Sequence, residues 1–382
     1  MKEKLKVDEI LKTFENGDEL IYNYRGIRIE FKGKRRVLST SVLHGGIQEE
    51  LVGVFNYNCL ADEYECTLTE SSYEEELKRN AGRLHLDGER VTGISTAAWM
   101  ECVSIQEERF EDLVVTAVVT GGVDKNAVRV GDPASYYERN GQFTLVMEDA
   151  SITPGTINIM LYINKDLAPG VLCRALVTCT EAKVAAMEEL MLGSLYSTGI
   201  ATGSGTDGTI IVSDCSCSDW LTDAGEHSKL GELIGRSVKH AVKEALYLQT
   251  GACPARQHKI TERGKRYSIT VGSIWEYYEK HREEFLVENK KSFGSLCELE
   301  RKLLYADTDS NLVVWFSLFL HLVDQYQWGL LEWGEILRES KVISKSMLQL
   351  GEESDWIFKV DEEKEILQVM LDRAKAVLLA LL

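Results

Sequence analysis

The segment DLVVTAVVT, residues Asp112–Thr120, is a nearly continuous run of apolar and mostly β-branched side chains. Such a run is typical of a strand buried on both faces, because a strand with one wet face alternates apolar and polar residues. Gly155–Ile163, GTINIMLYI, is a second run of this kind, and Gly26–Phe31 and Arg36–Val42 are shorter β-rich segments. We therefore expect the first half of the chain to be built on sheets.

Two helices are predicted to cover these strands. Leu167–Leu192 carries apolar residues at helical spacing, and so does Lys229–Leu248. A further strand, Thr209–Val212, is expected between them. The order of elements predicts an α/β (α+β) domain over residues 1–250, a layered sandwich of mixed sheets with flanking helices.

The pattern changes near Gly251. Residues 251–273 are short of apolar side chains and are interpreted as a connector or an active-site flap, with a strand expected at most over Tyr267–Val271. Residues 274–382 carry helical patterns, clearest over Val313–Val323 and Asp361–Leu382, and are predicted to form an all-α accessory domain. The terminal AVLLALL, Ala376–Leu382, is too apolar to face water. It is therefore expected to pack against another apolar surface, such as that of a second subunit in a homo-oligomer.

Composition narrows the choice of partners and compartment. The 382 residues include 61 acidic and 43 basic side chains, a formal net charge of −18. Because an acidic surface repels phosphate, neither nucleic acid nor an anionic membrane is expected as a partner. The most apolar run, Leu312–Val323, is well short of the ~20 residues that a membrane span needs. A polar N-terminal segment and nine cysteines without a regular framework predict a cytoplasmic protein with free thiols.

A glycine-rich loop, YSTGIATGSGTDGTIIVSD, spans Tyr196–Asp214. A dinucleotide site runs strand, glycine turn, helix, whereas here the predicted order is helix, loop, strand. The loop also lacks the Gly-Lys-Ser/Thr ending of a phosphate-binding P-loop. Phosphate binding is therefore not expected. Two interpretations remain: Thr206 and Asp207 point into a cleft, or Asp207 caps its own turn.

Two other glycine-rich loops follow predicted strands. Gly121–Pro133 offers Asp124, Asn126, Arg129 and Asp132, and Ser39–Ile47 offers Ser39, Ser41 and His44. Polar residues at strand ends are typical of sites built on a rigid sheet, although each loop by itself is also consistent with a plain turn.

Six blocks, in order, carry a resemblance to a known family: SVLHGGI, GGVDKNAVRVGDPA, GTINIML, RALVTCTEAK, YSTGIATGSGTDGTIIVSD and AGEHSKLGELIGRSV. From about Val37 to Gly251 the chain resembles the adenosylcobinamide amidohydrolases of cobamide (vitamin B12) salvage. The resemblance implies hydrolysis of the amide between a corrin propionate side chain and aminopropanol, giving adenosylcobyric acid and 1-aminopropan-2-ol. It implies a corrinoid substrate and no cofactor. A non-catalytic corrinoid-binding or trafficking protein is the alternative.

Amide hydrolysis needs a nucleophile, an oxyanion stabiliser and a proton donor for the leaving amine. His227, just ahead of a helix, is the predicted general base and acid, although the neighbouring Ser228 also fits a helix N-cap. Thr206 is a candidate nucleophile or propionamide ligand, Asp207 a candidate to orient a base or water, and Asn126 a candidate oxyanion donor. The predicted substrate-binding residues are His44, Asp132, Thr156, Asn158, Gly203 and Gly205. Asn158 interrupts an apolar strand, so it has either a structural or a substrate partner.

Four further expectations concern the fold, one helix face, metal binding and the walls of the substrate site. Residues from Pro154 onward are similar to the second half of the self-processing β-aminopeptidases, but Pro154 stands where their nucleophile stands, so only a layered α/β fold is inferred. Glu181 and Lys183 are expected on an exposed helix face, and no metal site is expected because the cysteines lack paired CxxC spacing. The corrin is expected to lie against aromatic walls, with candidates Tyr57, Trp99, Tyr136, Tyr137, Tyr196 and Trp220.

Overall fold

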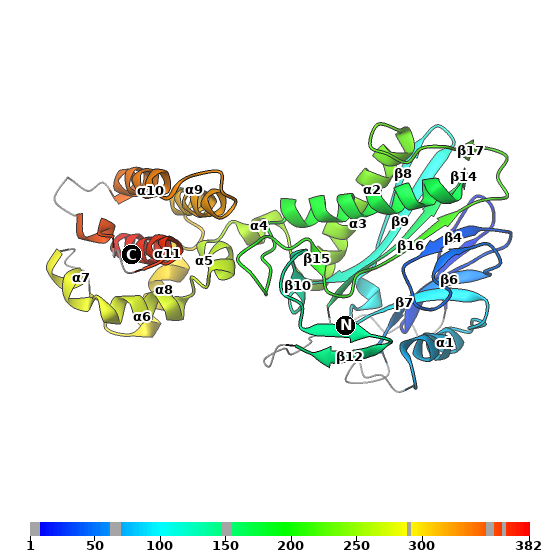
Figure 1. The fold of residues 1–382 in the computed structure, drawn as a ribbon, viewed down its shortest axis with the longest axis horizontal. Coiled ribbons are helices and arrows are strands. Elements are labelled where there is room, and N and C mark those ends of the chain that lie inside the picture. Colours follow the sequence, from blue (N-terminus) through cyan, green and yellow to red (C-terminus); the bar gives the residue numbers. More distant parts are fainter. Residues whose placement is uncertain (1–7, 62–69, 147–154, 289–291, 349–354, 361–363) are drawn as a thin grey trace. The chain divides into compact units, whose positions relative to one another are not determined.

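The computed structural model describes residues 8–61, 70–146, 155–288, 292–348, 355–360 and 364–382 (Figure 1). The chain divides into two compact units, Met1–Cys253 and Pro254–Leu382, each with a hydrophobic core of its own. Pro154 lies outside the described residues.

A six-stranded mixed sheet is the centre of the first unit. Its strand order is β5 (Gly46–Gln48), β4 (Arg36–Ser39), β16 (Gly208–Ser213), β13 (Thr156–Ile163), β9 (Leu113–Gly122) and β8 (Ser104–Phe110). The two long apolar runs are confirmed as β9 and β13, and every residue of β13 is buried. β13 pairs antiparallel with β9 and parallel with β16.

A five-stranded sheet packs against one face of the six-stranded sheet. Its order is β1 (Glu9–Thr13), β2 (Glu19–Asn23), β3 (Gly26–Glu30), β6 (Gly53–Asn58) and β7 (Val91–Thr96). Side chains alternate across a strand, so Met160 and Tyr162 of β13 join the core between the sheets, whereas Ile159 and Leu161 point to the opposite face. That alternation explains why β13 is apolar throughout.

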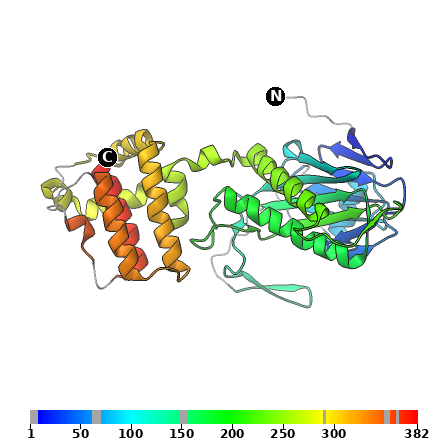
Figure 2. The same ribbon diagram turned by 90° about the horizontal axis from the view of Figure 1, so that it is seen from above.

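Helices cover the two outer faces. The helices α2 (Pro169–Glu189) and α3 (Lys229–Thr250) pack on the outer face of the six-stranded sheet (Figure 2). The helix α1 (Tyr73–Arg83) packs with Phe55 and Tyr57 on the outer face of the five-stranded sheet. The predicted layered α/β sandwich with flanking helices is confirmed.

Local chemistry sets the limits of α3. The side chain of Ser228 accepts a hydrogen bond from the backbone N–H of Gly231 at 3.0 Å, so Ser228 is the N-cap. Gly251 ends the helix in the left-handed conformation, φ 72°, that favours glycine. Pro169 begins α2 at a position where its missing N–H costs no hydrogen bond.

Short elements complete the first unit. They are the pairs β10 (Ala127–Val128) with β15 (Gly203–Ser204), β11 (Tyr136–Arg139) with β12 (Gln142–Leu145), and β14 (Asp166–Leu167) with β17 (Trp220–Leu221), and the 3-10 helix η1 (Met100–Cys102).

Two predictions for this unit need correction. The strand predicted over Arg36–Val42 ends at Ser39, because the backbone N–H of Ser41 already donates to the Ser39 side chain in a turn. The expectation of free thiols is wrong for Cys59, which is disulfide-bonded. The free thiols among the described residues are Cys102, Cys173, Cys179, Cys215, Cys217, Cys253 and Cys297.

In the described residues, the second unit consists of helices. They are α4 (Pro254–Gln257), α5 (Ile260–Gly264), η2 (Lys265–Tyr267), α6 (Val271–Lys280), α7 (Arg282–Glu288), α8 (Leu296–Ala306), α9 (Ser310–Gln327), α10 (Trp333–Leu348), η3 (Asp355–Phe358) and α11 (Ile366–Leu381). The predicted all-α region is confirmed, but the strand considered at Tyr267–Val271 is wrong, because Tyr267 ends η2 and Val271 begins α6. Residues 361–363 of the predicted terminal helix lie outside the described residues.

The core of the second unit also draws on the segment interpreted as a connector. Ile260, Tyr267 and Ile269 are buried in it together with Phe316 and Phe319 of α9. The apolar C-terminal run packs in the same core, where Ala376–Leu379 are buried. The unit therefore covers this run with its own side chains.

Candidate active site

Two glycine-rich loops and Gly155 meet at one end of the six-stranded sheet, where β13 and β16 begin and β9 ends. Ala127 and Val128 pair with Ser204 and Gly203 through β10 and β15. The side-chain amide of Asn126 donates to the carbonyl oxygen of Gly155 at 3.0 Å. The loop after β9, Gly155 ahead of β13 and the loop before β16 thus lie together, and this region is here called the glycine-loop end.

Two threonine hydroxyls lie together at this end. The Oγ1 atoms of Thr156 and Thr206 are 2.6 Å apart, and the Thr206 hydroxyl also donates to the carbonyl oxygen of Gly155 at 3.0 Å. Thr206 is exposed, whereas Thr156 is 5% exposed. The Thr206 hydroxyl is therefore held in one orientation at the surface, where a substrate can reach it.

Asp207 is the anchor of the glycine loop. Its carboxylate accepts hydrogen bonds from the backbone N–H of Ile157 at 2.9 Å, from the backbone N–H of Ser204 at 3.1 Å and from the Ser204 hydroxyl at 2.6 Å. It also forms an ion pair with Lys183 of α2, and both side chains are largely buried, 13% and 14% exposed. The carboxylate thus joins loop, strand and helix.

Gly203 is required by this anchor. A Cβ atom at Gly203 would lie 2.2 Å from Oδ2 of Asp207 and 2.7 Å from Nζ of Lys183. Any other residue would push the ion pair apart, since real Cβ atoms do not approach other atoms so closely. Gly205, in contrast, is exposed beside the Asn126 amide, with nothing closer than 3.5 Å to an added Cβ.

Lys183 is a residue of this cluster that sequence reasoning missed. The expectation that it occupies an exposed helix face is wrong, because its ammonium group is turned to Asp207. Glu181 is exposed as predicted, and the neighbouring Glu226 carboxylate raises the pKa of Glu181. The signal available in the sequence was a lysine on the helix that directly precedes the glycine-rich loop.

Asn126 and Asn158 have different surroundings. Asn126 is buried, and its side-chain oxygen accepts from the Tyr196 hydroxyl at 3.3 Å, so it links the cluster to a half-exposed tyrosine. Asn158, 1% exposed, donates to Oδ1 of Asn56 at 2.8 Å and to the carbonyl oxygen of Ser95 at 3.0 Å, and accepts from the N–H of Gly208 at 3.1 Å. Asn158 is therefore occupied in joining the two sheets.

Asp132 and His44 each make a hydrogen bond to a segment distant in the sequence. Asp132 accepts from the backbone N–H of Arg129 at 2.8 Å and from the Ser194 hydroxyl at 2.6 Å. Burial opposes ionisation of Asp132, but the hydrogen bonds from Ser194 and its neighbours hold the pKa of this carboxyl below its usual value. Nδ1 of His44 lies 2.7 Å from the carbonyl oxygen of Val91, in a loop that starts at the glycine-loop end.

The structure does not bring His227 to this cluster. His227 is exposed, next to Glu226, whose carboxylate pairs with Arg174 of α2 at 2.7 Å. Arg174 and Lys183 are separated by about 14 Å of helix. Lys229, two residues after His227, lies over the ring of Phe110. Phe110 ends β8 at the opposite end of the sheet from the glycine-loop end. His227 therefore lies apart from Thr206 and Asp207, because α3 begins where β9 begins.

The aromatic residues considered as walls of the substrate site also divide into some near the glycine-loop end and some away from it. Tyr57 is buried in the core under α1, and Trp220 lies in β17 at the end where β13 finishes. Trp99 is 47% exposed, and its backbone N–H donates to Gln249, which in turn lies against Gly122 at the glycine-loop end. Tyr137 and Tyr196 are also exposed. Trp99 and Tyr196 are thus the aromatic side chains best placed beside the cluster.

A separate polar cavity of about 500 Å³ lies at the opposite end of the sheet, where Tyr162 stands near the end of β13 and Asp214 follows β16. Beside it, the buried guanidinium of Arg35 binds Asp18 at 2.7 Å and Asp214 at 2.9 Å. The Tyr162 hydroxyl donates to Asp18 at 2.7 Å, and burial next to this carboxylate raises the pKa of Tyr162. This network is fully paired and fastens the two sheets together.

Within the described ranges, no group of three or more His, Cys, Asp or Glu residues is arranged to hold a metal ion. In the same part of the chain, no helix combines the length and apolar character needed to cross a membrane.

Fold and cluster together define a layered α/β protein whose polar groups gather at the glycine-rich ends of its central strands. Residues 9–254 match the model of the adenosylcobinamide amidohydrolase family, and the chain belongs to that family. An uncharacterised protein of Methanocaldococcus jannaschii is 33% identical over 237 residues, which cover 61% of this chain and 89% of that protein. The family match involves the first unit, so the second unit is an addition to the family domain.

Proposed function

We propose that this chain hydrolyses the amide between a corrin propionate side chain and aminopropanol in adenosylcobinamide, releasing adenosylcobyric acid and 1-aminopropan-2-ol. The family membership of residues 9–254 supports the amide-hydrolysing chemistry. The observation that carries the proposal at the residue level is the exposed Thr206 hydroxyl, held between Thr156 and Gly155 beside the buried Lys183–Asp207 pair.

Thr206 is the group proposed to touch the scissile amide. Its hydroxyl is the exposed member of the cluster and is already oriented by two hydrogen bonds, which lowers the entropy cost of positioning it. In this role Thr206 either attacks the carbonyl carbon or holds the attacking water. Asp207 and Lys183 are positioning residues, because they form an ion pair with each other and the Asp207 carboxylate also accepts a backbone hydrogen bond from Ile157.

His44 is the proposed proton acceptor in preference to His227. Its loop starts at the glycine-loop end, and the contact between Nδ1 and the carbonyl oxygen of Val91 fixes the Nδ1–H tautomer, which leaves Nε2 as an acceptor. The exposed rings of Trp99 and Tyr196 suit the apolar face of a corrin.

The test is incubation of the full chain with adenosylcobinamide, followed by mass spectrometry for adenosylcobyric acid and aminopropanol. Formation of both products supports the proposal. A shift of the visible corrinoid bands without any product over long incubation would support the alternative, a corrinoid-binding or trafficking protein. A folded protein that neither binds nor cleaves the corrinoid would refute both.

A further inference from the structure

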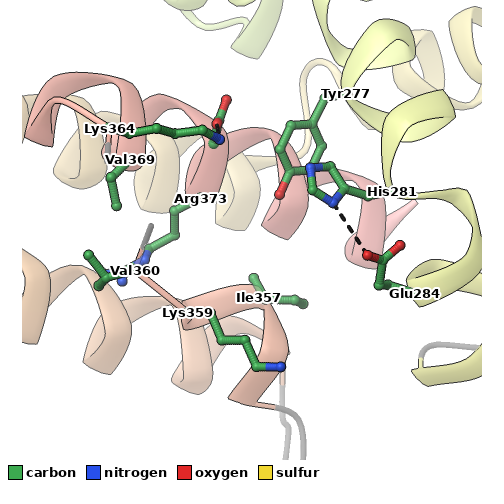
Figure 3. Close-up of a pocket in the computed structure, with 10 residues that line it drawn as sticks. Tyr277, His281, Glu284, Ile357, Lys359, Val360, Lys364, Val369 and Arg373 are labelled. Carbon is green, nitrogen blue, oxygen red and sulfur yellow. Dashed lines mark hydrogen bonds and ion pairs between the residues drawn. The ribbon is translucent and has the colours of Figure 1, made fainter. Parts of the chain in front are cut away.

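The second unit contains a cavity of about 230 Å³ whose wall holds a buried arginine. The cavity lies between α6, α7, η3 and α11, and Figure 3 shows Arg373, His281, Tyr277 and Lys359 around it. Ligand pockets for drug-sized molecules measure about 300–1,000 Å³, so this cavity suits a small ion or group and is too small for a corrin. Any ligand here is therefore different from the substrate of the first unit.

Arg373 is buried without an acidic partner. It is 3% exposed, and its Nη atoms donate to neutral oxygens only: the Leu337 carbonyl at 2.8 Å, the Ser340 hydroxyl at 2.6 Å and the Phe358 carbonyl at 3.2 Å. No ion pair to Arg373 is found among the described residues, and its Nε–H is buried without a hydrogen-bond acceptor. Burial lowers the pKa of Arg373 to about 10, the direction expected for a cation that lacks a nearby anion.

The acidic residues of the cavity lie beside other basic side chains. Asp372 pairs with Lys364 at 2.7 Å, and Glu284 lies 3.7 Å from Nδ1 of His281. The carboxylates therefore do not neutralise Arg373. The cavity keeps an excess of positive charge, which is unusual in a chain with a net charge of −18.

Two further basic side chains, His281 and Lys359, also line the cavity. Nε2 of His281 is buried and has no hydrogen-bond partner in the described part of the chain. In the tautomer that carries its proton on Nε2, this nitrogen is a hydrogen-bond donor. Lys359 lines the cavity from the segment after η3, is exposed, and makes no ion pair within the described residues. Arg373, His281 and Lys359 come from three different segments, and all three line the cavity.

We propose that this cavity binds a small oxyanion, the phosphate or carboxylate group of a metabolite, through Arg373, His281 and Lys359. An oxyanion supplies the negative charge and the acceptor atoms that the buried Nε–H of Arg373 lacks. The site is independent of the amide-hydrolysing cluster, since all of its residues belong to the second unit.

The experiment is isothermal titration calorimetry of the full chain with sodium phosphate and, separately, with sodium acetate, each against sodium chloride of equal ionic strength. We expect saturable binding in at least one oxyanion arm and none with chloride. The arm that saturates identifies a phosphate-type or a carboxylate-type ligand. If neither oxyanion binds more tightly than chloride, the proposal is wrong.

Variants test the location. Arg373→Gln should abolish binding, and Lys359→Ala should weaken it by up to about fivefold, as expected for an exposed charge. Arg301→Ala is the matched control, because it removes one exposed positive charge from α8 outside the cavity, and it should bind like the parent. If Arg373→Gln does not fold, His281→Gln and Lys359→Ala decide the question. Equal affinities in Lys359→Ala, His281→Gln and Arg301→Ala would place the bound anion elsewhere and overturn the proposal.

Discussion

The ammonium group of Lys183 on α2 is paired with the carboxylate of Asp207 in the glycine loop, and both side chains are largely buried. The same carboxylate accepts a hydrogen bond from the backbone N–H of Ile157 near the start of β13. One ion pair therefore fixes the position of the loop that carries Thr206 relative to the central strand. A buried pair of this kind is costly to break from one side, because the remaining charge is left without a counter-charge.

Asp207→Asn is expected to lower the free energy of unfolding of the first unit by about 3 kcal/mol, since Lys183 is left buried and unpaired. Urea unfolding followed by circular dichroism measures this change. Lys183→Met combined with Asp207→Asn should recover part of the loss. Lys229→Met is the control, because the Lys229–Glu232 pair is exposed and is expected to contribute less than about 1 kcal/mol. A loss no larger than that of the control would show that the pair does not hold the loop.

Thr206→Ala is expected to reduce the turnover of adenosylcobinamide by about 100-fold or more, while Thr206→Ser retains most of it, because serine keeps the hydroxyl. Product formation by mass spectrometry under single-turnover conditions measures both. Thr180→Ala, which removes an exposed hydroxyl from α2, should behave like the parent. Full activity in Thr206→Ala would remove this residue from the mechanism.

Substitution of the two histidines should have unequal effects. His227→Gln is expected to change turnover by less than about threefold, because His227 lies at the other end of the sheet from Thr206. His44→Gln is expected to reduce turnover by about 100-fold if His44 accepts the proton. Both residues are solvent-accessible, so circular dichroism should show folded variants. The reverse order of effects would assign the proton transfer to His227.

Asn158→Ala is expected to cost about 2–4 kcal/mol of unfolding free energy, because the amide oxygen of Asn56 and the N–H of Gly208 lose their buried partner. Chemical denaturation measures the loss. The KM of the folded fraction should stay close to that of the parent, since Asn158 is 1% exposed and out of reach of a substrate. A large rise in KM without loss of stability would instead support direct substrate binding.

Acid should weaken the contribution of Asp132 to the free energy of unfolding. Its hydrogen bonds hold the pKa of the folded carboxyl below the unfolded value of about 3.9, so the stabilisation is complete above that pH. It is lost as the pH falls through the lower folded pKa, because both states are then protonated. Denaturation of the parent and of Asp132→Asn at pH 7 and at successive values below about 4 measures this. The stability difference should shrink with acid, and a constant difference would contradict the assignment.

Much of the fold could be predicted from local pattern. The apolar runs that became β9 and β13 were recognisable because a strand buried on both faces has no room for alternation. The helical spacing and the Ser228 and Gly251 caps likewise set α3 in the predicted place. The candidate site was predictable only in part: Thr206, Asp207, Asn126 and Thr156 do lie together, whereas His227 does not join them.

The sequence by itself determined the elements, their order and the family, because each depends on residues that are neighbours along the chain. The tertiary structure alone decided which distant groups meet: Lys183 with Asp207, Asn158 with Asn56, and Arg373 with a cavity whose carboxylates, Asp372 and Glu284, lie beside Lys364 and His281. The physical reason is that strand pairing and helix packing bring together segments of large sequence separation, and no local periodicity encodes which side chains will then share a low-dielectric interior.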